Sequence, residues 1–69
     1  MEDVTYVMEY TNEKLDGEWY VWRTYDRLCD AVEELGIEAA SRTHLKHRLV
    51  KEERITERTE LLTIKEQGE

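Results

Sequence analysis

The chain has 69 residues, of which seventeen are acidic and ten basic, so its formal net charge is −7. This length allows one domain with a small core and leaves little room for a deep substrate cavity. The negative charge opposes approach to nucleic acid and to anionic membranes and favours basic partners. Cys29 is the single cysteine, so an intramolecular disulfide cannot form. We expect no signal peptide, because residues 1–10 lack a basic start, and no membrane span, because no apolar run approaches about 20 residues. We expect one cytoplasmic domain over 1–69, frayed at 66–69.

Two segments near the N-terminus have the pattern of β-strands. In residues 4–10, apolar and aromatic side chains recur at every second position, the period of a strand with one buried face. Residues 19–24 are aromatic and β-branched, which favours a second strand. Asp16-Gly17 lies between the two segments and is a turn signal, so we expect an antiparallel hairpin.

An amphipathic helix is expected after the hairpin, with Thr24 or Asp26 as its N-cap and Gly36 at its C-terminal end. At about 100° per residue, one side of this helix is apolar and the opposite side acidic. The apolar side holds Leu28, Ala31, Val32 and Leu35, and the acidic side holds Asp26, Asp30, Glu33 and Glu34. Cys29 lies at the edge of the apolar side, where we expect it to be half-buried.

A second, shorter helix is predicted from about 39–41 to Lys51, because Leu45 and Leu49 are one turn apart. The segment Thr59–Lys65 is predicted as a closing strand, preceded by a short extended piece around Ile55. The expected fold class is therefore α+β, with a β-hairpin, one long and one shorter helix, and a closing strand.

Charge is segregated along the chain. Residues 1–40 carry eleven acids and three bases, which gives −8, whereas residues 41–58 carry six bases and three acids, which gives +3. Residues 59–69 contribute −2. The excess of negative charge therefore belongs to the hairpin and the first helix.

The sequence indicates no catalytic, cofactor or metal site. Carboxylates beside Cys29 would raise its pKa and weaken it as a nucleophile, and paired carboxylates on a convex helix face do not form a cleft for acid–base work. His44 and His47 lie one turn apart in the expected helix but have no third ligand nearby. The three glycines are isolated, so no phosphate loop is present.

Residues 28–58 allow an alternative interpretation, a divergent winged helix-turn-helix that binds DNA. The second helix would carry the basic side chains, which are Arg42, His44, Lys46, His47, Arg48 and Lys51. Val32 stands where this motif usually has a small residue, and Arg42 where it is usually apolar. The rest of the chain carries about −10 (−7 minus +3), which opposes approach to phosphates.

The acidic helix side is the main candidate for a functional surface. Neighbouring carboxylates on a helix repel each other by a few tenths of a kcal/mol per pair, so stability alone does not favour them. One interpretation is a merely solvated face; the other is a surface that imitates the DNA backbone and binds a basic protein. The helix would contribute Asp26, Asp30, Glu33, Glu34 and Glu38, and the hairpin Glu9, Glu13, Asp16 and Glu18.

In its size, its charge, its lack of a catalytic motif and its acidic helix side, the chain resembles the small acidic early proteins by which lytic bacteriophages take over their host. Some proteins of that class are DNA mimics, and one known type of target is the nucleoid protein HU. The resemblance implies a cytoplasmic inhibitor that blocks the access of an HU-like protein to DNA. The basic segment 41–58 departs from a uniformly acidic mimic.

A third interpretation is an inhibitor or adaptor of another host machine, such as RNA polymerase or a protease chaperone. Trp19, Tyr20 and Trp22 would then be anchors, because Trp and Tyr dominate interface energetics. Alternation places Trp19 on the side opposite to Tyr20 and Trp22, and an exposed aromatic face would also allow a homodimer.

Overall fold

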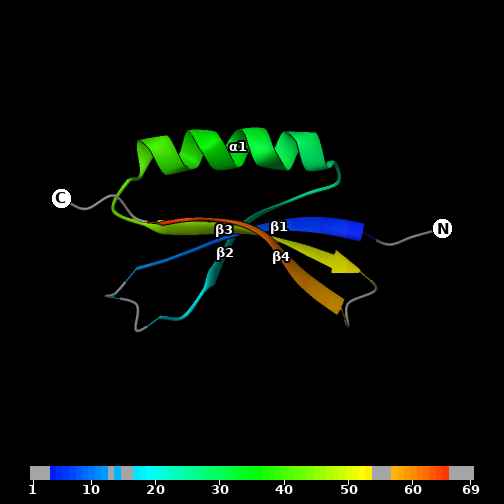
Figure 1. Ribbon diagram of the computed structural model, residues 1–69, viewed down its shortest axis with the longest axis horizontal. Coiled ribbons are helices and arrows are strands. Elements are labelled where there is room, and N and C mark those ends of the chain that lie inside the picture. Colours follow the sequence, from blue (N-terminus) through cyan, green and yellow to red (C-terminus); the bar gives the residue numbers. More distant parts are fainter. Residues whose placement is uncertain (1–3, 13, 15–16, 54–56, 66–69) are drawn as a thin grey trace.

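The computed structural model describes residues 4–12, 14, 17–53 and 57–65. Within these residues, four strands and one helix follow along the chain: β1 (Val4–Thr11), β2 (Tyr20–Tyr25), α1 (Leu28–Ser41), β3 (Lys46–Glu53) and β4 (Glu57–Ile64). The strands form one antiparallel sheet in the order β2-β1-β3-β4. The helix lies across one face of the sheet (Figure 1), and we call the other face the open face.

The strands expected at both ends of the chain are present. β1 and β2 pair as the predicted hairpin, with Tyr6 opposite Tyr25 and a register shift between Met8 and Glu9. β4 covers most of the predicted closing strand. The extended piece expected around Ile55 and the frayed end expected at 66–69 lie outside the described residues.

The predicted two-helix arrangement is wrong, because Lys46–Glu53 forms the central strand β3 in place of a second helix. Leu45 and Leu49 are four residues apart, a spacing that fits two strand periods as well as one helical turn. The tertiary context decides between them. β3 pairs along its whole length with β1 on one side and over residues 47–53 with β4 on the other, so that its backbone groups are satisfied in the middle of the sheet.

The helix also differs from the prediction at both ends. α1 continues through Gly36 to Ser41, because Ala39 is buried one turn after Leu35 and extends the packed stripe. At the start, Arg27 occupies the N-cap position with an extended backbone and makes no capping hydrogen bond from its side chain. Neither Thr24 nor Asp26 is the cap.

The core lies between α1 and the middle of the sheet. Met8 of β1 and Leu49 of β3 pack against Ala31 and Leu35 of the helix, and all four are fully buried. Leu28 and Val32, expected in the same stripe, are 45% and 41% exposed. The helix packs mainly on β1, β2 and β3, and the stripe that it buries there is narrower than expected, formed by Ala31, Leu35 and Ala39.

In the described part of the chain, the helix α1 is not long and apolar enough to cross a membrane.

Candidate functional site

Four carboxylates lie on one side of α1, and we call them the acidic row: Asp30, Glu33, Glu34 and Glu38. Asp30 and Glu33 are exposed, whereas Glu34 and Glu38 are half-buried. This placement follows from the helical period, because Ala31, Leu35 and Ala39 face the sheet and turn the acidic side chains outward and to one flank. The helix therefore carries Asp30, Glu33, Glu34 and Glu38 of the expected set, whereas Asp26 precedes its first residue.

The acidic row extends along the flank of the helix that overhangs β2. The pKa of Tyr25 in β2 is raised, mainly because its phenol is partly buried. The negative charge of Glu34 is the second cause, and that of Glu38 acts in the same direction. Arg23 opposes this shift. The charges of Glu34 and Glu38 therefore act on Tyr25 of β2, a strand that α1 packs against.

Most of the negative charge in the row has no counter-ion among the residues that the structure describes. Glu38 pairs with Arg42, with 2.9 Å between Oε1 and Nε. Among the described residues, no ion pair involves Asp30, Glu33 or Glu34. Four carboxylates and one guanidinium leave a local charge of −3, which is available to an external cation.

The charge density of the row approaches that of a nucleic-acid strand. Asp30 and Glu38 are eight residues apart, which corresponds to about 12 Å along a helix that rises about 1.5 Å per residue. The remaining charge of −3 over that length gives about one unit charge per 4 Å, and one strand of B-DNA carries about one per 3.4 Å.

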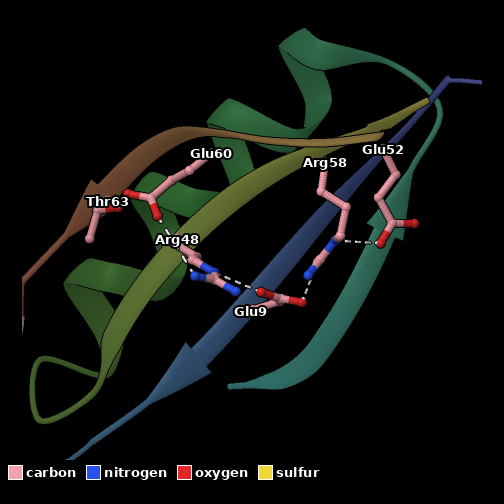
Figure 2. A network of polar contacts seen from close by, with 6 residues as sticks. All are labelled: Glu9, Arg48, Glu52, Arg58, Glu60 and Thr63. Atoms are coloured by element: carbon pink, nitrogen blue, oxygen red, sulfur yellow. Dashed lines mark hydrogen bonds and ion pairs between the residues drawn. The ribbon is translucent and has the colours of Figure 1, made fainter. Parts of the chain in front are cut away.

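The hairpin does not extend this surface in the way expected. Glu9 is buried on the open face between two arginines (Figure 2), so it cannot meet a partner. Glu18 is exposed in the segment before β2, and Asp26 is exposed just before α1. Glu13 and Asp16 lie outside the described residues.

Glu9 instead joins β1 to β3 and β4. Its Oε1 accepts a hydrogen bond of 2.7 Å from Nε of Arg48, and its Oε2 accepts one of 2.7 Å from Nη2 of Arg58. Arg58 also lies 2.9 Å from Glu52, and the hydrogen bond to Glu9 is the largest cause that raises the pKa of Arg58. The guanidinium of Arg48 stacks on Trp19 at 4.1 Å from the ring centroid. Much of the basic charge of residues 41–58 is thus paired within the protein.

The basic residues expected on one DNA-binding helix do not share a surface. Because β3 alternates, Lys46 and Arg48 lie on the open face, while His47 and Lys51 lie on the helix face. His47 is buried, and its Nδ1 has no hydrogen-bond partner in the described part of the protein. Burial lowers the pKa of His47 below its ordinary value, although Glu38 and the Leu45 carbonyl oppose the shift.

A groove of about 200 Å³ opens where the acidic row ends. It is lined by Tyr10, Trp22, Glu38, Arg42, Leu45 and His47. Tyr10 and Trp22 pack edge to face with ring centroids 6.2 Å apart, and the Arg42 guanidinium lies 5.2 Å from the Trp22 centroid. The sequence did not reveal this groove, because its residues come from β1, β2, β3, the end of α1 and the connection that follows it.

Cys29 is exposed rather than half-buried as expected. Its Sγ lies 3.9 Å from the Asp30 carboxylate. Within the ranges that the structure describes, no three His, Cys, Asp or Glu side chains are placed to hold a metal ion.

Comparisons with protein-family models, with curated proteins and with solved structures found no match to this chain.

Proposed function

We propose that this protein is a non-enzymatic inhibitor whose acidic row binds a basic DNA-binding protein of a bacterial host, such as HU, and blocks that protein's access to DNA. The observation that carries the proposal is the set of carboxylates on α1 that form no ion pair with any other described residue. The cytoplasm of a phage-infected host is the compartment that this role requires.

Two physical arguments support a basic macromolecule as the partner. Unpaired carboxylates on a rigid helix attract cations over roughly 8–10 Å at physiological ionic strength. The charges on the helix are spaced at about one per 4 Å, and the phosphates along one DNA strand are spaced at about 3.4 Å. A protein surface that contacts phosphates at that spacing can therefore contact these carboxylates as well. A lone cation would not need a row of this length, whereas a DNA-binding surface presents several basic side chains at once.

A competition assay tests the proposal. Purified HU is bound to a fluorescently labelled duplex, the protein is added, and the anisotropy of the duplex is followed. We expect the anisotropy to fall as HU is released, and this release to weaken as salt is added, because the attraction is screened. If a large excess leaves HU on the DNA at moderate salt, HU is not the partner.

Matched charge reversals test the surface itself. The variant D30K/E33K removes half of the acidic row, and E57K/E60K makes the same change of four charge units on β4, so both have a net charge of −3 (−7 plus 4). We expect D30K/E33K to lose competition and E57K/E60K to retain most of it. Equal losses in both variants would indicate that total charge, and not the acidic row, determines binding.

The same assay without HU examines direct DNA binding. An increase in the anisotropy of the duplex on addition of this protein alone would contradict the proposal.

A further inference from the structure

We propose that the groove at the end of the acidic row binds one arginine side chain of the basic partner, which replaces the protein's own Arg42 between Trp22 and Glu38. This inference rests on the proposed function, since it specifies which side chain of a basic partner the protein recognises.

The first support is that the groove already accommodates a guanidinium. The Arg42 guanidinium lies 5.2 Å from the centroid of the Trp22 ring, and its Nε lies 2.9 Å from the Glu38 carboxylate. A cation over an aromatic face combined with a carboxylate is a favourable environment for arginine. The protein thus shows, with its own residue, what chemistry the groove accepts.

The second support is that Arg42 can be displaced while its partner stays in place. The side chain of Arg42 is 47% exposed and follows the last residue of α1, whereas the side chain of Glu38 is 16% exposed within the helix. Exposed ion pairs contribute little to stability. Exchanging one guanidinium for another therefore costs the fold little and leaves Glu38 and Trp22 in position.

The other lining residues suit a single cationic side chain. Tyr10 packs edge to face on Trp22 and stacks on Tyr20 at 5.9 Å, which fixes the aromatic wall. His47 lines the groove, and because burial lowers its pKa it favours the neutral form, which does not repel a cation. The volume of about 200 Å³ is smaller than the roughly 300–1,000 Å³ of typical small-molecule sites.

The third support is continuity with the acidic row, because Glu38 belongs to both. A basic segment lying along Asp30 and Glu34 would reach the groove at the end of the row. There its arginine would gain a cation–π contact in addition to the ion pair. Lysine lacks the planar guanidinium that stacks on a ring and pairs with a carboxylate, so we expect the groove to prefer arginine.

An NMR titration with a blocked Gly-Arg-Gly tripeptide tests the groove. The control probe is the same peptide with citrulline, which has nearly the shape of arginine without its charge. We expect arginine to shift the indole N–H signal of Trp22 and the ring signals of Tyr10, with citrulline having no effect up to about 20 mM, where millimolar affinity would be detected. Equal shifts with both peptides, or none with either, would overturn the proposal.

Substitutions test the exchange of arginines. R42A removes the internal competitor, and R27A removes a positive charge from the start of the same helix, outside the groove. We expect R42A to bind the arginine peptide about threefold tighter or more, and R27A to change binding less. W22L should bind it about two- to fivefold more weakly, with folding checked by circular dichroism. Weaker binding by R42A would show that Arg42 builds the groove and is not replaced.

A lysine-rich peptide separates this inference from the proposed function. If that peptide shifts the backbone amides of Asp30, Glu33 and Glu34 while the arginine peptide leaves Trp22 unchanged, the acidic row is supported and the groove is refuted. If the arginine peptide shifts Trp22 while neither the lysine-rich peptide nor HU engages the row, the arginine groove is supported and the proposed inhibitor function fails.

Discussion

Glu9 and Arg48 face each other across β1 and β3 on the open face, with 2.7 Å between Oε1 and Nε. Arg58 from β4 binds the second oxygen of the same carboxylate, so one buried side chain ties together three strands. The guanidinium of Arg48 also lies over the ring of Trp19. On the open face, this charge network thus holds the strands together (Figure 2). On the face that α1 covers, apolar packing has that role.

We predict that Glu9→Ala lowers the free energy of unfolding by about 2–4 kcal/mol, because it leaves two guanidinium groups without their shared acceptor. The matched control is Glu60→Ala, since Glu60 is half-exposed and lies 3.7 Å from Arg48. That change should cost less than about 1 kcal/mol. Urea unfolding of both variants provides the measurement, and equal losses would contradict a central role for Glu9.

The position of Glu9 illustrates where sequence-based prediction ends. Alternation in β1 correctly places Glu9 on the side opposite to Met8, but such a residue is ordinarily solvated. It is buried because Arg48 and Arg58 come to it from 39 and 49 residues further along the chain. No local pattern contains that information. The same limit explains the error at β3, whose neighbours in the sheet decide its structure.

The acidic row could be predicted because it depends on one helix and one period. The groove beside it could not, because Tyr10, Trp22 and Leu45 meet only once the sheet has formed. The spacing of Glu38 and Arg42, four residues apart, was the single local signal for their ion pair.

A second prediction concerns the part of α1 that supports the acidic row. The side chain of Leu35 is fully buried between α1 and the sheet, whereas the side chain of Val32 on the same helix is 41% exposed. Leu35→Ala should therefore cost about 2–5 kcal/mol, and Val32→Ala less than about 1 kcal/mol. Thermal unfolding followed by circular dichroism would measure both. A larger loss for Val32→Ala would mean that this flank of the helix is covered.

A third prediction follows from the lowered pKa of His47, which burial causes. Below about pH 6.5 the unfolded chain binds a proton at this residue, while the folded protein resists protonation until a lower pH. The contribution of neutral His47 to the free energy of unfolding is therefore fully present above pH 6.5. It is lost as the pH falls toward the lower pKa that His47 has in the folded protein. The slope is at most about 1.4 kcal/mol per pH unit.

Urea unfolding between pH 7 and pH 5 measures this loss, and H47L should flatten the decline. H44A is the control, because His44 is exposed and is only the last-ranked cause that lowers the pKa of His47, so most of the decline should remain. Direct titration of the His47 ring by NMR provides a separate check. A midpoint at or above 6.5 would contradict the prediction.

The fourth prediction uses two glycines whose backbones impose opposite requirements. Gly36 lies inside α1 with a helical backbone, and a Cβ added there would meet no atom within 4 Å. Gly36→Ala should therefore stabilise the protein by about 0.5–1 kcal/mol, because alanine restricts the unfolded chain and favours the helix.

Gly17 has a φ of 76° before β2, a region that L-residues rarely adopt. Gly17→Ala has equal space but should destabilise by about 1–2 kcal/mol through backbone strain. Since both variants add one methyl group in open space, their opposite signs in urea unfolding would isolate the effect of backbone conformation. A destabilising Gly36→Ala would show instead that the helix ends at Gly36 in solution.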